Sequence, residues 1–516
     1  MPDTSELPTR LDRFRSMMAT ERFRWWLVFI VLVMIAAVRA ATPHERDHFW
    51  SARAGIENLQ GMPLIRPDTW SWSKEGEWVP NSPLWNIVLG IGWQAGGFWG
   101  LFWVGFVSIA AFFALALLLA RLAGARAFPT LVGFAPVLMF GFSAFTPRAT
   151  MIVQSLLFLA VLFVWWWGGR AGRTGMFTSI AVVGGAGFAL SLLGNWLHLS
   201  FMLMSAAIAV MWAIGWWASP GVRGTRWLSL TAAGTTGLLL GCVASPFGIP
   251  LTLERARVVA EACRGLISEW QSIVDLLGVQ GFRFVPFTVV VVVLAIVAPL
   301  WVIHVLRTSG RFDPRVRIIV PLAAIGVPAL VAGLDTLRFT LVGMLLLLPV
   351  FAGAATSLIN ALHRRQARGV GLLSRPKAME YTSGRFWTVI LTGLMILVTP
   401  LVAINVAQGA TTPEASVISA LPRECRLWAT HTVGSSTILL RPDVKVWFDG
   451  RADFYGRDHL IAYLTTLTPE GQLPEGTDCV VLSSEPIDQW LANSLDERPG
   501  WSRVDSEAGY TLWVRE

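Results

Sequence analysis

The chain has 516 residues, of which 54% are hydrophobic and only 14% are charged. Soluble domains carry about 25% charged residues, so this composition excludes an ordinary soluble protein and predicts one that crosses a membrane many times. A net charge of +8 is also found in proteins that bind nucleic acids, but the arginines here lie in short clusters between apolar runs, as the positive-inside rule requires. Nucleic-acid binding is therefore excluded.

The apolar segments predict a bundle of membrane-spanning helices. A helix needs about 20 apolar residues to cross the hydrocarbon core, and we count eleven such segments. The first lacks the small-residue cleavage site of a signal peptide, so we expect it to be retained. Segment 84–97 is short and glycine-rich and is expected to form an interfacial helix. The expected spans are residues 23–41, 98–120, 128–145, 150–168, 176–194, 198–217, 227–245, 285–306, 317–333, 339–359 and 387–407.

Arginine placement predicts the orientation of this bundle. Six arginine-rich segments fall on the same side of the membrane when eleven spans are counted. The positive-inside rule makes that side cytoplasmic, so the N-terminus is expected inside and the C-terminus outside. The six segments lie within residues 10–24, 121–126, 170–173, 223–226, 307–317 and 364–385.

The outer loop after the first span, residues 42–97, concentrates charge and aromatic side chains. Between His44 and Trp85 it holds five tryptophans together with several carboxylates and arginines. Charge beside a bilayer is costly unless it is solvated or paired, so this loop is a candidate functional site. A solvated loop with an interfacial aromatic belt explains the composition equally well.

This loop opens with a literal H-E-x-x-H pattern formed by His44, Glu45 and His48. On a helix the two histidines would share one face and hold zinc, with the glutamate as the base of a metallopeptidase. The pattern directly follows Pro43, however, and no third ligand is obvious farther along the chain. A zinc peptidase is therefore kept as an alternative hypothesis, and no metal ligand is assigned.

Asp47 gives the same loop a different chemistry. A carboxylate just outside the first span can act as the general base on an acceptor hydroxyl, with a pKa raised by partial burial and balanced by nearby arginines. Trp70, Trp72 and Trp78 offer flat apolar faces that suit the C–H surfaces of sugars. Each of these tryptophans taken singly is explained more simply as a belt residue.

Further polar residues stand at the outer ends of the expected helices. The planar fork of an arginine suits a phosphate group. Each residue alone is explained more simply as an interfacial or helix-capping residue, but all of them project toward one side, as a single active site requires. They are Arg148, Asn195, His198, Glu269 and Arg338.

From about Thr411 to the end, the composition becomes that of a soluble domain. Strands alternate with helices there, which predicts a small α/β domain with a partly parallel sheet. Cys425 and Cys479 border two of the strands and are expected to form either a disulfide or two buried thiols. Asp449 and Asp453 in the run 448–456 could bind a cation, but turn formation explains them more simply. The expected strands are 426–432, 445–449, 478–483 and 510–514, and the expected helices are 458–467 and 486–495.

The order of these motifs resembles bacterial integral-membrane proteins related to the GT-C glycosyltransferases. In that family an acid opens the first outer loop, and a series of glycine, proline, aspartate, serine and tryptophan follows. The chain departs from the family at residues 81–83 and in the spacing between Asn195 and His198. The matching positions run in the same order through most of the chain: Asp47, Arg53, Gly55, Gly61, Pro63, Asp68, Ser71, Gly76, Trp78, Arg148, Asn195, His198, residues 245–248, Glu269, Trp270, Arg338 and residues 448–456.

The resemblance implies a GT-C-like membrane domain over residues 1–410 and an extracytoplasmic α/β domain over residues 411–516. It implies an inverting glycosyltransferase of the plasma membrane that uses no metal or other cofactor. Such an enzyme moves a sugar from a polyprenyl-phosphate donor to a cell-envelope glycan or lipid acceptor on the outer face. The alternative is a non-catalytic membrane protein that binds lipid-linked sugars or assists assembly. Asp47 matches the position of the catalytic base, and the implied substrate-binding residues are Arg53, Asp68, Trp72, Trp78, Arg148, His198, Glu269 and Arg338.

The orientation can be tested with reporter fusions. A reporter that is active only outside the cell should be active when fused after Glu516 and silent when fused after Arg368. The reason is that Arg368 lies in a segment expected on the cytoplasmic side, and the last expected span, residues 387–407, separates it from Glu516. The opposite pattern would refute the eleven-span arrangement and place the candidate site on the other face of the membrane.

Overall fold

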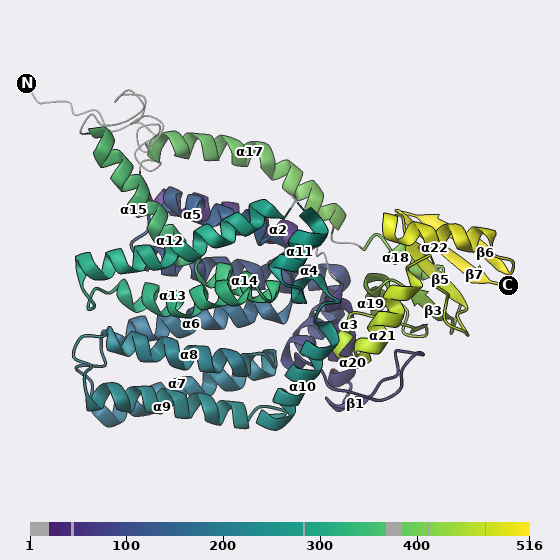
Figure 1. Ribbon diagram of the computed structural model, residues 1–516, viewed down its shortest axis with the longest axis horizontal. Coiled ribbons are helices and arrows are strands. Elements are labelled where there is room, and N and C mark those ends of the chain that lie inside the picture. The colour runs from purple at the N-terminus through teal and green to yellow at the C-terminus, as the bar shows by residue number, and fades with distance from the viewer. Residues whose placement is uncertain (1–19, 43–45, 282–283, 368–383, 410–411, 470) are drawn as a thin grey trace, which may run out of the picture.

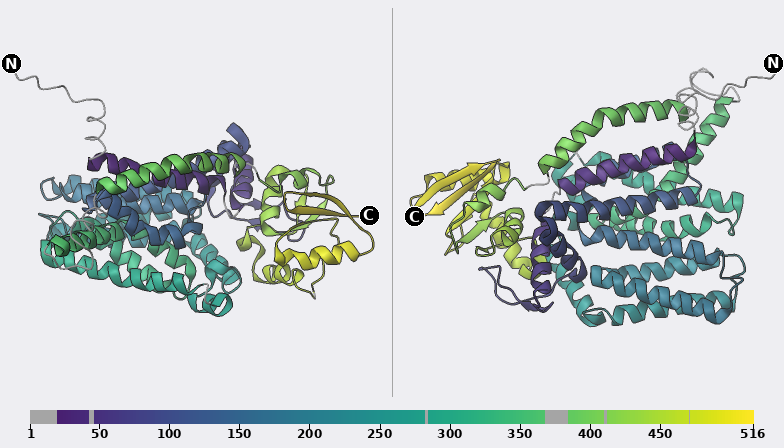
Figure 2. Two further views of the ribbon diagram at one scale, coloured as in Figure 1. Left: turned by 90° about the horizontal axis from the view of Figure 1, so that it is seen from above. Right: turned by 180° about the vertical axis from the view of Figure 1, so that it is seen from behind.

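The structure is a computed structural model that describes residues 20–42, 46–281, 284–367, 384–409, 412–469 and 471–516. A bundle of apolar helices carries a smaller α/β unit at one end, and the two parts stay side by side in three views (Figures 1 and 2). The bundle helices are α2 (Glu21–Ala41), α4 (Pro83–Leu122), α5 (Ala127–Phe140), α6 (Ala149–Gly168), α7 (Met176–Leu197), α8 (Phe201–Trp217), α9 (Thr225–Val243), α12 (Val285–Ser309), α13 (Val316–Ala332), α14 (Leu337–Leu346), α15 (Leu348–Ala367) and α17 (Gly384–Gly409).

The lengths of these helices bear on the expected number of spans. Among the described residues, six helices are long and apolar enough to cross a membrane, and two sharply bent pairs raise the number to eight if each pair is one span. The bends are 76° between α9 and α10 (Gly248–Cys263) and 57° between α14 and α15. The remaining expected spans coincide with the shorter apolar helices α5, α8 and α13. The bundle of membrane helices is thus present, while the count of eleven stays a prediction.

The outer loop is more ordered than its sequence indicates. Residues 47–59 form helix α3 (Asp47–Leu59), and the expected interfacial segment is the first arm of α4, which breaks at Gly96 and Gly97. Gly97 has φ +56° and ψ −130°, a backbone conformation that favours glycine. A Cβ at Gly55 would overlap the main-chain carbonyl of Asn86, so glycine lets α3 lie directly on this arm. The packing places Asp47 at the start of α3, beside the end of the bundle.

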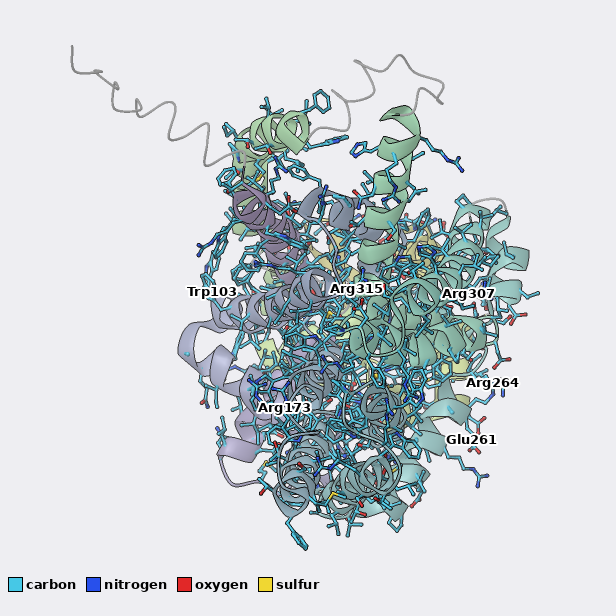
Figure 3. The ribbon with its side chains drawn as sticks, turned by 90° about the vertical axis from the view of Figure 1, so that its left-hand side faces the viewer. Trp103, Arg173, Glu261, Arg264, Arg307 and Arg315 are labelled. Atoms are coloured by element: carbon cyan, nitrogen blue, oxygen red, sulfur yellow. A yellow bond between two sulfur atoms is a disulfide. The ribbon has the colours of Figure 1, made fainter. Side chains whose placement is uncertain are left out.

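The described arginine-rich connections, residues 121–126, 170–173, 223–226 and 307–317, lie together at the end of the bundle away from the C-terminal unit (Figure 1). Arg226, the second residue of α9, donates hydrogen bonds to the carbonyls of Ala171 and Thr174 at 2.7 and 3.0 Å. These bonds link the α8–α9 connection to the α6–α7 connection. Figure 3 looks onto this end, where Arg173 and Arg315 are labelled. The candidate site and the arginine clusters therefore occupy different ends of the same bundle.

The C-terminal unit is a five-stranded mixed sheet in the order β4-β3-β5-β7-β6. Strands β3, β4 and β5 are parallel, whereas β6 and β7 form an antiparallel hairpin. A disulfide joins Cys425 to Cys479, with 6.2 Å between their Cα atoms. Of the two states expected for these cysteines, the structure has the disulfide and not two buried thiols. The elements are β3 (Arg426–Ala429), β4 (Lys445–Val446), β5 (Cys479–Ser483), β6 (Trp501–Glu507), β7 (Tyr510–Arg515), α18 (Ala415–Ser419), α19 (His431–Leu440), α20 (Ala452–Tyr455), α21 (Arg457–Thr466) and α22 (Pro486–Glu497).

A buried arginine fastens this unit to the outer loop. Arg451 is 1% exposed and pairs with Asp449 at 2.7 Å and with Asp68 of the loop at 2.5 Å. Its guanidinium also lies 4.5 Å from the ring centre of Trp70 and 5.2 Å from that of Trp78. Burial alone would lower the pKa of Arg451, but the neighbouring anionic groups outweigh it and raise that pKa, so the side chain stays charged.

The same loop also covers the open edge of the sheet. The N–H of Val446 in β4 donates to the carbonyl of Trp70 at 2.9 Å, and the N–H of Trp72 donates to the carbonyl of Val446 at 3.1 Å. Main-chain groups of an edge strand are thereby satisfied within the chain. The outer loop and the C-terminal unit consequently form one packed body, with Trp50, Trp70 and Trp78 in its apolar core.

Replacing Arg451 by Met tests this attachment. Asp449 and Asp68 would be left buried without their counter-charge, and breaking a buried pair costs about 3–5 kcal/mol. We expect a clearly lower thermal midpoint for the purified chain and faster proteolysis of residues 412–516. The control Arg257→Ala removes the exposed pair with Glu261 and should change neither measurement. Wild-type stability of Arg451→Met would show that the cluster does not fasten the two parts.

Candidate active site

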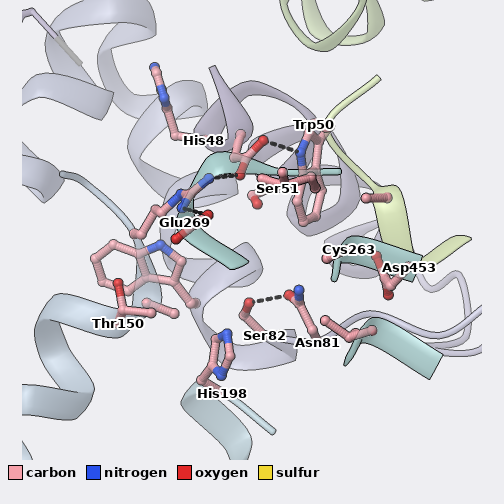
Figure 4. A pocket seen from close by; sticks show the side chains of 18 of the residues that line it. His48, Trp50, Ser51, Asn81, Ser82, Thr150, His198, Cys263, Glu269 and Asp453 are labelled. Atoms are coloured by element: carbon pink, nitrogen blue, oxygen red, sulfur yellow. Dashed lines mark hydrogen bonds and ion pairs between the residues drawn. The ribbon is translucent and has the colours of Figure 1, made fainter. Parts of the chain in front are cut away.

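A cavity of about 190 Å³ lies between the end of the bundle and the C-terminal unit. A water molecule takes up about 15 Å³ of such a cavity, so the space holds on the order of ten waters and can admit a phosphate or a sugar ring. Figure 4 shows side chains reaching it from several segments that are far apart in the sequence. Five of the nine residues proposed from the sequence line it: Asp47, Arg148, His198, Glu269 and Arg338.

Asp47 and Arg148 form the centre of the cavity. Asp47 is the first residue of α3, and Arg148 caps the start of α6. Their side chains form an ion pair at 2.5 Å through Oδ2 of Asp47, and the indole N–H of Trp50 donates to Oδ1 at 3.2 Å. Arg148 also reaches Oε1 of Glu269 at 3.5 Å. One arginine therefore lies between two carboxylates.

Glu269 and Arg338 occupy a neighbouring wall. Glu269 lies in the short 3-10 turn η2 (Ser268–Trp270). Burial would raise the pKa of Glu269, but Arg338 and Arg148 outweigh it and the pKa is lowered, so the carboxylate is ionised at neutral pH. Arg338, in the first turn of α14, lies over the ring of Trp270 at 5.1 Å. Among the described residues, its guanidinium has no hydrogen bond or ion pair.

Three helix starts surround this space: those of α3, α6 and α14. The N-terminus of a helix carries a partial positive charge, because its first N–H groups have no partners within the helix. Two of these starts, those of α6 and α14, carry an arginine that lines the cavity. The cavity therefore combines a carboxylate with an environment that favours an incoming anion.

His198, which follows the last residue of α7, adds a neutral side chain. Burial, Arg338 and Arg148 together lower its pKa to about 3. Its Nδ1 atom is 3.1 Å from the N–H of Ser200 and accepts that hydrogen bond. Asn81 and Ser82 lie across from it (Figure 4), joined by a hydrogen bond of 2.6 Å. This part of the cavity offers hydrogen-bonding groups without net charge.

The C-terminal unit supplies residues that the sequence did not assign to the site. His431, Gly450, Ala452 and Asp453 line the cavity. Asp453 pairs with Arg255 of α10 at 3.0 Å, and burial raises its pKa. The signal in the sequence is the run 448–456, which belongs to the family resemblance but whose local pattern is that of a turn.

Four proposed substrate-binding residues do not line the cavity. Arg53 pairs with Glu57 at 2.7 Å, Asp68 pairs with Arg451, the indole of Trp72 donates to the carbonyl of Leu427 at 3.2 Å, and Trp78 is buried against Trp50 and Trp70. The segment from Asp68 to Trp78, which was expected to contribute substrate-binding residues, does not line the cavity. That loop is occupied by contacts with the C-terminal unit, and residues 450–453 and 263–270 close the cavity instead.

The zinc hypothesis is not tested by this structure. Within the part of the chain that is described, no group of three or more histidine, cysteine, aspartate or glutamate side chains has a metal-binding arrangement. His44 and Glu45 lie outside the described residues, so the H-E-x-x-H pattern stays a sequence hypothesis.

Comparison with known proteins agrees with the fold. No protein-family model and no curated protein sequence matches the chain. The structure of ArnT from Cupriavidus metallidurans in the apo state matches with a TM-score of 0.51 and 14% identity over 96% of this chain and 98% of ArnT. ArnT bound to undecaprenyl phosphate gives 0.49 and 14% over 95% and 97%. An Archaeoglobus fulgidus oligosaccharyltransferase tethered with an acceptor peptide gives 0.44 and 12% over 97% and 75%.

The first of these likenesses is close enough to show a common fold. The match to apo ArnT extends over nearly the whole of both chains, and at 14% sequence identity it is evidence for the fold but not for a shared activity. The protein therefore has a GT-C-like membrane fold, as the order of its sequence motifs predicted.

His431 makes the stability of the site depend on pH. Burial lowers its pKa from the usual 6.5, although Asp47 opposes the shift. Below pH 6.5 the unfolded chain therefore binds a proton that the folded chain does not. As the pH is lowered through this range, the free energy of unfolding falls by up to about 1.4 kcal/mol per pH unit. His431→Gln should reduce this loss when thermal midpoints are measured between about pH 7.5 and 5. An unchanged slope would show that the folded protein protonates His431 without cost.

Proposed function

We propose that the protein is a membrane glycosyltransferase that moves a sugar from a polyprenyl-phosphate donor to a cell-envelope acceptor. The observation that carries this proposal is one cavity in which the carboxylate of Asp47 lies beside Arg148 and near Arg338. An enzyme of this class needs a base for the acceptor hydroxyl and cations for the phosphate that leaves. ArnT, whose fold the chain shares, has been solved bound to undecaprenyl phosphate, which motivates the donor class.

Arg338 is the proposed phosphate ligand. Its guanidinium is half-buried, is held over Trp270, and has no carboxylate in contact among the described residues. A charge-assisted bond between arginine and phosphate would satisfy it, and the start of α14 adds a favourable dipole. Arg148 can contribute from the other side while keeping Asp47 in place.

Asp47 is the proposed base. In the proposed step the acceptor hydroxyl gives its proton to Asp47 while its oxygen forms a bond to the anomeric carbon. The bond from that carbon to the phosphate oxygen breaks, the anomeric centre is inverted, and the polyprenyl phosphate leaves as an anion that Arg338 stabilises. Arg148 and Trp50 hold one position of the carboxylate, whose remaining lone pairs are available to the hydroxyl.

The reaction is proposed to take place on the outer face of the plasma membrane. The cavity lies at the end of the bundle opposite the arginine-rich connections, and the positive-inside rule assigns those to the cytoplasm. The C-terminal unit, residues 411–516, would then be extracytoplasmic. A disulfide between Cys425 and Cys479 fits a compartment outside the cytosol.

A non-catalytic protein that binds lipid-linked sugars is the second candidate. It is favoured by one observation: both oxygens of Asp47 already have partners, in Arg148 and Trp50. Such a protein would bind undecaprenyl phosphate without transferring a sugar, so the two candidates differ in turnover and not in binding.

Two substitutions separate the roles of base and phosphate ligand. The donor to test is the lipid-linked sugar that accumulates in cells lacking the gene. Asp47→Asn removes the base but keeps its size, so transfer should fall about 10²-fold or more while undecaprenyl phosphate still binds. Arg338→Ala should instead weaken binding of undecaprenyl phosphate, because a charge-assisted contact is lost.

Matched controls come from the exposed pair of Asp335 and Arg264, which lie outside the cavity. Asp335→Asn and Arg264→Ala should leave transfer and binding as in the wild type. Full activity of Asp47→Asn, or unchanged binding by Arg338→Ala, would contradict the roles given to these residues. Binding without any transfer by the wild type would favour the second candidate.

A further inference from the structure

Main chain of the C-terminal unit lies directly against the proposed base. A Cβ atom added at Gly450 would overlap Oδ1 of Asp47 and would lie 3.1 Å from the indole nitrogen of Trp50. The nearest atoms to that position all belong to these two residues. While Asp47 keeps its place, position 450 therefore has no room for any side chain.

Backbone conformation does not explain this glycine. Gly450 is absent from the glycines with positive φ, so alanine could adopt the same backbone angles. Gly456, six residues later, has φ +81° and needs glycine for conformational reasons. At Gly450 the requirement comes from contact between the two parts of the protein.

The turn that carries Gly450 cannot easily retreat. Asp449 accepts hydrogen bonds from the main-chain N–H of Arg451 at 2.9 Å and from the hydroxyl of Tyr455 at 2.7 Å. The N–H of Gly450 donates to Oγ of Ser435 at 3.1 Å. Asp449 and Arg451 are both buried and form an ion pair that continues to Asp68 of the outer loop. The turn is thus held from both sides.

We propose that the turn Asp449–Gly450–Arg451 is a positioning element for Asp47. Its main chain closes one side of the carboxylate at Oδ1, while Arg148 holds Oδ2. The carboxylate is left with one orientation, toward the cavity. This inference rests on the proposed function for the role of Asp47 as base, and it makes the C-terminal unit a part of the active site.

A double-mutant cycle tests the contact without any assay of activity. Gly450→Ala, Asp47→Ala and the double variant are compared as full-length chains in detergent by their thermal midpoints. We expect Gly450→Ala to lower the midpoint by about 2 °C or more, and by clearly less in the Asp47→Ala background, where the carboxylate no longer blocks the methyl group. Equal losses in the two backgrounds would overturn the proposal.

The control is Gly278→Ala in helix α11 (Ile273–Gln280), where an added Cβ meets no atom within 4 Å. It should not lower the midpoint in either background. If Gly450→Ala fails to accumulate in membranes, the double variant should restore accumulation, and failure to do so counts against the contact.

Turnover separates positioning from mere stability. Gly450→Ala should lower the turnover of the accumulated lipid-linked sugar about tenfold or more, while undecaprenyl phosphate binds within about twofold of wild type, because a displaced base affects proton transfer and not donor binding. Wild-type turnover per folded molecule would overturn the proposal. A wild-type protein without turnover would refute the proposed function alone, since the stability cycle decides the contact by itself.

Discussion

A buried guanidinium needs anions beside it, and the contacts that Arg451 makes with two aspartates organise the end of the protein that carries the cavity. Its partners come from distant regions: Asp449 from its own turn, and Asp68, 383 residues away in the sequence, from the first outer loop. Trp70 and Trp78 pack on its planar face. Compared with well-packed apolar side chains at the same positions, a buried ion pair of this kind adds little to the free energy of unfolding. It does specify which two surfaces pack together.

The consequence of this attachment is a cavity that no single segment forms. The start of α3 gives Asp47, the start of α6 gives Arg148, the start of α14 gives Arg338, and the C-terminal unit closes the space. Helix starts are suited to this because their free N–H groups favour anions. Arg148 at such a position would be repelled by the dipole, and the carboxylates of Asp47 and Glu269 compensate for that repulsion.

The distribution of polar groups along the bundle follows from the bilayer. Irregular backbone and ionised side chains are tolerated only where water or protein satisfies them, so they collect at the two ends. One end gathers arginines whose side chains bind neighbouring carbonyls, as Arg226 and Arg317 do. The other end gathers mixed charges around a cavity. The same physical requirement therefore explains both the arginine clusters that predict the orientation and the position of the cavity at the other end of the bundle.

The elements whose signal is local can be predicted from the amino-acid sequence alone. Apolar length predicted the helices, strand and turn patterns predicted four of the five C-terminal strands, and the position of Asp47 at the end of the first span predicted a carboxylate at the bundle end. It also singled out Arg148, His198, Glu269 and Arg338, because polar residues at helix ends are conspicuous in an apolar chain.

Which polar residues contact one another depends on how distant segments pack, and the sequence does not show this. Arg53, Asp68, Trp72 and Trp78 have the same composition signal as the residues that line the cavity, yet they pack within the loop or against the C-terminal unit. A charged side chain near a membrane must be solvated or paired, but the sequence does not say which of the two applies or which partner it takes. The role of residues 448–456 was hidden for the same reason: a turn is recognised locally, while the close approach of Gly450 to Asp47 depends on a contact across about 400 residues of chain.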